Sequence, residues 1–348
     1  MRIAVRYTHR RRVTALSLAI WVLGSDLSQA ETAEARVEAE TLRQLLAQPS
    51  KRFESYRFDA SSNLADRVYE IPEDLIRPLR LRDRRKDYTP YTPTTGEMLL
   101  FASYLDLLPE VNRRLMEERV VAVFFVNNFL GIGMTDWVLD REGKLYFTMI
   151  INSNALKEGL STFLTRMELT CFRINDSTIK IAVNMGSKFR GLLYALMHES
   201  VHVVDYLRGI TPYPDRRFGK LAGKTDDSTE FTDRFWRTRT ETTTEYDPRI
   251  RQEVTFFYLD GGPKLNITEA PSIYERLSTM PFVSLYATTN WAEDLADTVT
   301  FYHLTKRLNI PYQIHLFKND MLIAEHVPTL KKVIRERYFP LHVFYGED

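Results

Sequence analysis

The chain has 348 residues, 44% of them hydrophobic, which is enough to bury a large core in one domain or in two smaller ones. Its 47 Lys and Arg against 46 Asp and Glu give a formal net charge of +1, so there is no electrostatic case for a nucleic-acid partner. The one cysteine, Cys171, excludes an intrachain disulfide and a Cys-rich zinc site, and its residue type favours a small buried hydrophobic group over a nucleophile.

Residues 1–30 have the pattern of a secretory signal peptide. Arginines between Arg2 and Arg12 precede a short apolar run at 13–24, and small residues at the end of the segment allow cleavage after Ala30. An uncleaved membrane anchor is the alternative, but the apolar run is short for a bilayer span. We therefore expect a secreted or periplasmic protein with no membrane segment after cleavage.

A charge-rich N-terminal segment is expected at 31–95. It begins with a polar helix at 32–48 and continues as an irregular, wrapping stretch at 72–96 that is punctuated by prolines. A prosegment is one interpretation, although no Cys or Asp stands out as a metal-blocking group. The main domain, 96–348, is predicted to begin with a helix at 97–118.

Strand patterns come next in the chain. Residues 119–128 are rich in β-branched and aromatic side chains, and 133–153 reads as a hairpin that turns at 140–143. A second strand pair is predicted at 166–174 and 178–184. These strands all precede the most apolar helical pattern of the sequence.

That helix is predicted at 190–209, and a long segment of weak regularity, 210–285, separates it from a second strong helix at 290–308. A last helix is predicted at 321–338. Strands followed by helices favour an α+β fold, with a twisted, mostly antiparallel sheet packed on the first of these helices and a helical C-terminal lobe.

Polar residues interrupt the apolar helix at 190–209. His198 and His202 are four residues apart, so they lie on one face of the helix and their imidazoles can reach one metal ion. Glu199 is placed beside them to take a proton from a water molecule at the metal. A pair of core histidines bonded to backbone is the alternative, but an apolar helix does not bury these groups and Asp205 without a partner. The pattern is HExxH.

A third metal ligand must come from elsewhere, because Arg208 occupies the position of a third histidine in the extended form of the pattern. Glu293 and Asp297 are four residues apart on the helix at 290–308, for which Asn290 is a suitable N-cap. We predict that Glu293 is the third ligand of a Zn²⁺ ion and that Asp297 bonds the far nitrogen of a ligating histidine. Ordinary surface carboxylates are the alternative, and the other candidate ligands are Glu230, Glu241, Glu245, Glu269, Glu275 and His303.

HExxH followed later by ExxxD resembles the gluzincin metallopeptidases. The stretches 198-HESVHVVD-205 and 286-YATTNWAEDLADTV-299 are similar to two segments of the anthrax lethal factor catalytic domain family. The resemblance is confined to the blocks 190–209 and 284–304. It implies a zincin-like catalytic domain over the main part of the chain, with the long segment before the second helix as an insertion.

The resemblance also implies roles for two further residues. In that family a tyrosine seven residues before the ligand glutamate bonds the developing oxyanion, and Tyr286 occupies the matching position here. That family also has an aspartate three residues after the second histidine of the motif. Asp205 holds that position, either supporting His202 or capping and pairing locally near Arg208.

The expected function is that of an exported zinc peptidase in which Glu199 is the general base and Tyr286 assists. Its partner is a peptide or protein substrate, bound as an added strand along 144–153. One face of that strand is predicted to carry Tyr146, Thr148, Ile150 and Asn152.

Two other functions remain open. One is a non-catalytic exported protein that binds a metal or a peptide on a peptidase fold, and the other is a hydrolase acting on a non-protein amide such as a cell-wall peptide. The non-catalytic protein is disfavoured because all four residues needed for catalysis are present: His198, Glu199, His202 and Glu293. Nothing in the sequence separates the second from proteolysis of a protein.

Overall fold

The computed structural model describes most of the chain, and the predicted signal peptide at 1–30 lies outside the described part. Within that part, no helix combines the length and the apolar composition that a membrane span requires. The described residues are 33–243, 245–246, 250, 253–257, 261–338 and 341–345.

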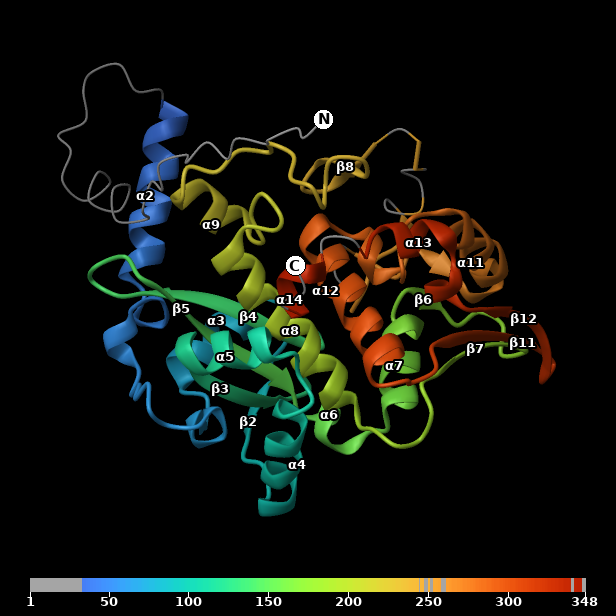
Figure 1. Ribbon diagram of the computed structural model, residues 1–348, viewed down its shortest axis with the longest axis horizontal. Coiled ribbons are helices and arrows are strands. Elements are labelled where there is room, and N and C mark those ends of the chain that lie inside the picture. Colours follow the sequence, from blue (N-terminus) through green and yellow to red (C-terminus); the bar gives the residue numbers. More distant parts are fainter. Residues whose placement is uncertain are drawn as a thin grey trace, which may run out of the picture.

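The first five described strands of the chain form one mixed sheet (Figure 1). β3 (Val120–Asn127) runs parallel to β5 (Leu145–Asn152) and to the short β1 (Val68–Tyr69). β2 (Thr89–Tyr91) pairs antiparallel with β3, and β4 (Gly133–Leu139) pairs antiparallel with β5. The prediction of a mostly antiparallel sheet was therefore wrong, whereas the predicted hairpin of β4 and β5 is confirmed.

The order of these strands also corrects the predicted substrate-binding edge. β5, expected as an edge strand at 144–153, lies between β3 and β4, and β4 is the edge of the described sheet. β3 and β5 are buried along nearly their whole length, as interior strands are. The alternating pattern of a hairpin does not reveal which of its two strands lies next to β3. The sequence therefore could not determine which strand forms the edge of the sheet.

Helices cover both faces of the sheet. α8 (Gly191–Arg208) lies against β4 and β5 together with α5 (Glu110–Arg119) and α4 (Thr95–Leu105), and their apolar side chains form the main core. α3 (Glu73–Arg82) packs on the opposite face over a smaller core. The helix predicted at 97–118 is thus two helices. α3 forms within the stretch that was expected to be irregular.

α8 itself has the predicted limits. It ends at Gly209, which has a φ of 65°, the left-handed conformation that glycine adopts without strain. All its residues from Gly191 to Asp205 are buried, including the polar ones. Such a helix is held by contacts on every side, and its buried polar groups need partners.

The predicted pairing of strands at 166–174 and 178–184 was wrong, although the second strand itself is confirmed. The first part of the 166–174 segment belongs to α7 (Leu160–Leu169), whose apolar residues recur at helical spacing and are buried, and only β6 (Phe172–Arg173) is a strand within it. β7 (Ile179–Asn184) pairs antiparallel with β11 (Gln313–Lys318), far along the chain.

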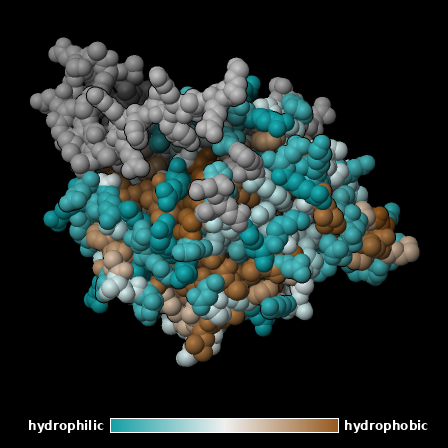
Figure 2. All heavy atoms as spheres, in the orientation of Figure 1, coloured by the Kyte–Doolittle hydropathy of each residue, from teal (hydrophilic) through white to brown (hydrophobic). Residues whose placement is uncertain are grey.

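The predicted helix at 321–338 was also mostly wrong. β12 (Met321–His326) forms a hairpin with β11 around Asn319 and Asp320, which both have positive φ, as a two-residue hairpin turn requires. Only α13 (Lys332–Glu336) follows as a short helix. Figure 2 shows hydrophobic residues at the right-hand edge, where β12 exposes Met321, Leu322 and Ile323.

α12 (Trp291–Tyr302) crosses α8 in the middle of the molecule and continues into a π-helical turn at His303–Arg307 (Figure 1). Asn290 caps it by accepting hydrogen bonds from the backbone N–H groups of Ala292 and Glu293. The crossing of α8 and α12 brings the two predicted ligand segments together.

The remaining elements lie outside the sheet and the two crossing helices described above. They are α2 (Ala33–Ala47), η1 (Pro49–Lys51), η2 (Phe53–Ser55), η3 (Leu64–Arg67), α6 (Asn154–Lys157), β6 (Phe172–Arg173), α9 (Arg216–Leu221), β8 (Trp236–Thr238), β9 (Glu241–Thr242), β10 (Leu265–Asn266), η4 (Ile267–Glu269), α11 (Ala270–Thr279), η5 (Tyr286–Thr288), η7 (Pro328–Leu330) and α14 (His342–Tyr345). Cys171 is fully buried among them, as its residue type suggested.

The close approach of α7 to α8 can be tested at Gly191. A Cβ atom there would lie 2.4 Å from Cγ of Phe163, so Gly191→Ala forces the two helices apart and should lower the free energy of unfolding by about 1–3 kcal/mol. The control is Gly96→Ala at the exposed first turn of α4, where nothing outside the helix backbone lies within 4 Å of the added Cβ. That change should be neutral or stabilise by up to about 1 kcal/mol. Urea unfolding measures both, and equal effects would contradict the packing.

Candidate metal centre

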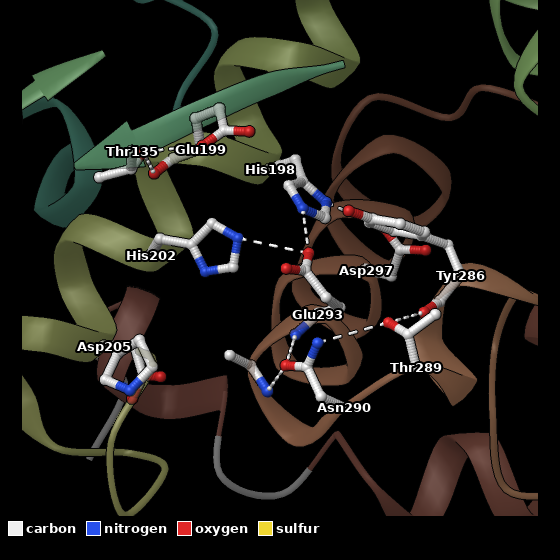
Figure 3. A network of polar contacts seen from close by, with 12 residues as sticks. Thr135, His198, Glu199, His202, Asp205, Tyr286, Thr289, Asn290, Glu293 and Asp297 are labelled. Atoms are coloured by element: carbon white, nitrogen blue, oxygen red, sulfur yellow. Dashed lines mark hydrogen bonds and ion pairs between the residues drawn. The ribbon is translucent and has the colours of Figure 1, made fainter. Parts of the chain in front are cut away.

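α8 and α12 bring two histidines and a carboxylate to one point (Figure 3). Nε2 of His198 lies 2.9 Å from Oε2 of Glu293, and Nε2 of His202 lies 3.5 Å from the same oxygen. One ligand atom from each residue lies within 4.8 Å of the other two. The structure thus gathers the predicted ligand set, although His198 and Glu293 are 95 positions apart.

This group can hold a metal ion. Two imidazole nitrogens and one carboxylate oxygen form a donor set that suits a divalent transition metal and leaves a coordination position for water or substrate. His198 is almost completely buried, whereas the side chains of His202 and Glu293 keep a small exposed surface. Among the described residues, the other candidate ligands do not join this group.

Asp297 fixes the orientation of His198. Its Oδ1 lies 2.9 Å from Nδ1 of His198 and accepts a hydrogen bond from the Tyr194 hydroxyl at 2.5 Å. Its Oδ2 accepts from the Ser284 hydroxyl. Because Nδ1 is bonded to Asp297, Nε2 faces Glu293. This is the arrangement that supports a metal-binding histidine.

These carboxylates change the proton affinity of His198. Burial alone would lower its pKa, but the hydrogen bonds with Asp297 and Glu293 outweigh burial and raise the pKa to about 10. Burial likewise opposes ionisation of Glu293, yet His202 and His198 hold the pKa of Glu293 well below its usual value. The metal-free site is therefore a buried ion pair whose proton a metal would have to displace.

Glu199 points away from the ligand group, toward β4 (Figure 3). Thr135 donates a hydrogen bond from its hydroxyl to Oε2 of Glu199 at 2.8 Å. Gly133 leaves space for the carboxylate, since a Cβ atom at this position would lie 2.8 Å from Oε1. Burial raises the pKa of Glu199, and the neighbouring histidines partly oppose that shift. No pattern in the sequence marks Thr135 or Gly133 as partners of Glu199.

Tyr286 lies on the other side of the histidines. Its ring centroid is 5.7 Å from that of His198, and the rings of Phe256 and Phe257 pack against it at 5.0 and 6.0 Å. Burial, and then the carboxylates of Glu293 and Glu199, raise the pKa of Tyr286 well above its usual value. The phenol therefore keeps its proton and can donate a hydrogen bond at the site.

Asp205 has a local role in the described contacts. It accepts hydrogen bonds from the backbone N–H of Thr211 at 2.7 Å and from the Thr211 hydroxyl at 2.6 Å. Burial raises its pKa to about 6. Of the two predicted roles, these bonds favour local pairing over support of His202, because they fix the loop that follows α8.

Asp294, which follows the predicted ligand Glu293, lies in a buried ion pair outside the ligand group. Its carboxylate accepts hydrogen bonds from Arg337 at 2.8 and 2.6 Å and from Nε1 of Trp236 at 2.7 Å. The Arg337 guanidinium lies over the rings of Phe231 and Phe235. Trp236 of β8 and Arg337, which follows α13, thus hold the first turn of α12.

A cleft of about 710 Å³ extends along β4 beside the ligand group. Glu199, His202, Tyr286 and Glu293 contribute to its lining. The same cleft is also lined by residues of the N-terminal segment, including Leu45, Gln48, Ser50, Lys51 and Tyr56. The ligand group is therefore accessible from a space that is large enough for several residues of a peptide.

Comparison with protein-family models, curated proteins and solved structures finds no match. The function is therefore inferred from the site itself.

Because the pKa of His198 is raised, the stability of the metal-free protein is expected to depend on pH. The folded-state pKa of about 10 exceeds the ordinary value of 6.5, so His198 contributes stability that is fully present below pH 6.5 and is lost as the pH rises toward 10. The difference in unfolding free energy between wild type and His198→Gln should shrink over this window. Urea unfolding in chelator at several pH values measures it, and a constant difference would contradict the assignment.

The Arg337–Asp294 pair predicts a large stability effect. Arg337→Met leaves the Asp294 carboxylate buried without its cation and should lower the free energy of unfolding by about 3–5 kcal/mol. Adding Asp294→Asn removes the unpaired charge and should recover part of that loss. Arg335→Met, on the exposed side of α13, is the control and should change stability by less than about 0.5 kcal/mol. Thermal and urea unfolding of the four proteins measure these effects.

Proposed function

We propose that the protein is an exported zinc-dependent peptidase in which His198, His202 and Glu293 bind the metal. The observation that carries the proposal is the meeting of these three ligand atoms within 4.8 Å, with Glu199 on the adjacent position of the same helix. Two histidines and a glutamate, with a free carboxylate beside them, are the donor set of catalytic zinc in peptidases. Export follows from the signal-peptide pattern at 1–30.

The residues of the site have distinct tasks in this reaction. A zinc ion, when bound, supplies a Lewis acid that polarises a carbonyl group and acidifies water. Glu199 accepts the proton of the attacking water and passes it to the departing amine. Its raised pKa suits a group that must both accept and release a proton near neutral pH.

Tyr286 is proposed to stabilise the oxyanion. Its phenol is protonated and lies next to His198 and Glu293, so it can donate a hydrogen bond to negative charge that develops on the substrate oxygen. Phe256 and Phe257 restrict the ring to this position. Asp297 keeps His198 oriented throughout and takes no proton from the substrate.

The peptide is proposed to bind along β4 rather than β5. β4 is the described edge of the sheet, and Thr135 on this strand contacts Glu199 directly. An extended chain that pairs with an exposed strand edge gains main-chain hydrogen bonds regardless of its side chains. The described cleft follows this edge, which supports a peptide over a compact small molecule.

A zincin-like fold related to the lethal factor family remains part of the proposal. In its favour, a sheet precedes the HExxH helix, its edge strand contacts the catalytic glutamate, and the ExxxD helix crosses the first one. The sequence separations and the placement of Asp297 and Tyr286 agree with that resemblance. The strand order of the mixed sheet gives no support to the zincin-like fold.

Metal content and turnover test this proposal. Wild type and Glu199→Gln should each contain about one zinc per chain by elemental mass spectrometry, because Glu199 does not bind the metal. Turnover of a random peptide mixture should fall by about 10²–10⁴-fold in Glu199→Gln, since the general base is lost. His198→Ala and Glu293→Ala should lose zinc.

Two matched changes serve as controls. Glu275→Ala removes an exposed carboxylate that the structure leaves out of the ligand group, and Glu118→Gln alters an exposed glutamate on α5. Both should keep zinc and turnover. Zinc retained in Glu293→Ala would move the third ligand elsewhere, and full turnover in Glu199→Gln would reject the assigned base.

A further inference from the structure

The outer edge of β4 offers a limited set of backbone groups. Hydrogen bonds from Asn152 N to Ile132 O (3.0 Å) and from Asp140 N to Lys144 O (3.1 Å) flank the β4–β5 pairing, so even-numbered residues of β4 bond to β5. The odd-numbered residues direct their backbone groups outward. These are Gly133, Thr135, Trp137 and Leu139.

A segment of the N-terminal region, which we call the strap (residues 48–56), occupies the far part of this edge. Lys51 forms an ion pair with Asp136, donates a hydrogen bond to the Trp137 carbonyl at 3.3 Å and lies 4.1 Å from the centre of the Trp137 ring. Arg52 forms a parallel β-bridge with Leu139. The Trp137 N–H is taken as well, by the Asp136 carboxylate at 3.0 Å.

The strap is firmly held. The Lys51 ammonium is nearly buried, so separating it from Asp136 would leave a charge without a partner. Tyr56 donates a hydrogen bond to the Ser50 carbonyl at 2.9 Å and closes the strap on itself. α2, which leads into the strap, stands beside the turn between β4 and β5 (Figure 1), and its Leu45 is buried.

The near part of the edge is open and lies at the catalytic residues. Gly133 and Thr135 both contact Glu199, and no backbone partner covers their outer side among the described residues. The rise of a strand is about 3.4 Å per residue, so the edge from Thr135 to Trp137 is about 7 Å long. A peptide strand that passes Glu199 therefore meets the strap within about two residues.

We infer that the strap is an end-stop of the substrate cleft, so that the substrate is a peptide cut within about two residues of one of its ends. The inference rests on the proposed peptidase function and names its substrate class. Hydrolysis adds the hydroxyl of water to the carbonyl carbon and its proton, by way of Glu199, to the leaving amine. One product is then a single residue or a dipeptide.

The test uses the zinc-loaded protein and a mixture of random-sequence peptides of fourteen residues with free ends. Mass spectrometry of the products gives the position of every cut. Wild type should cut within about two residues of one end and leave the interior intact. Lys51→Met keeps the aliphatic stem but loses the two polar contacts that Lys51 makes with β4, so interior cuts should rise at least ten-fold relative to terminal ones.

Controls separate this inference from the proposed function. Lys144 is an exposed lysine in the turn just before β5. Lys144→Met should leave the cut positions unchanged. Asp136→Asn weakens the same ion pair from the sheet and should act like Lys51→Met, which keeps the test decisive if one variant does not fold.

Each outcome has a defined meaning. Interior cuts by wild type overturn the end-stop while leaving the peptidase function in place. Unchanged cut positions in folded, zinc-loaded Lys51→Met or Asp136→Asn also overturn it. If zinc-loaded wild type cuts no peptide, the proposed function fails and the end-stop fails with it.

Discussion

The hydrogen bond between Asp297 and His198 is the contact on which the site depends. A carboxylate with no exposed surface is costly to bury, and here three donors offset that cost: a histidine ring, a tyrosine hydroxyl and a serine hydroxyl. The bond ties α12 to α8 at the point where they cross. It also sets which imidazole nitrogen faces Glu293, so the packing of the two helices and the orientation of the candidate ligand His198 depend on the same interaction.

Two layers of support surround this contact. On the α12 side, the pair of Asp294 and Arg337 holds the first helical turn, one residue from the candidate ligand Glu293. On the sheet side, Thr135 and Gly133 hold Glu199 from a strand that contributes no ligand. His198 and Glu199 are thereby each positioned by an element other than their own helix. Such support keeps catalytic groups within a fraction of an ångström of a working geometry.

The sequence predicted what depends on local spacing. The ligand group was predicted from the four-residue intervals between His198 and His202 and between Glu293 and Asp297. The limits of α8 were predicted to within one residue from its apolar pattern. Contacts between distant segments carry no such period. Neither Arg337 nor Thr135 has a sequence feature that marks its partner, and the order of β4 and β5 depends on packing against β3. The wrong strand at 166–174 shows that β-prone side chains can still occupy helical spacing.

The order in which the parts of the site occur along the chain has a consequence for its assembly. Asp297 lies 99 residues beyond His198, and Arg337 lies a further 43 residues beyond Asp294. A chain that emerges residue by residue, from a ribosome or through a membrane pore, therefore exposes α8 long before α12 exists. Until then, the two histidines of α8 lack the carboxylates of Glu293 and Asp297. The metal of the proposed peptidase would then come from the compartment in which residues 191–337 first come together.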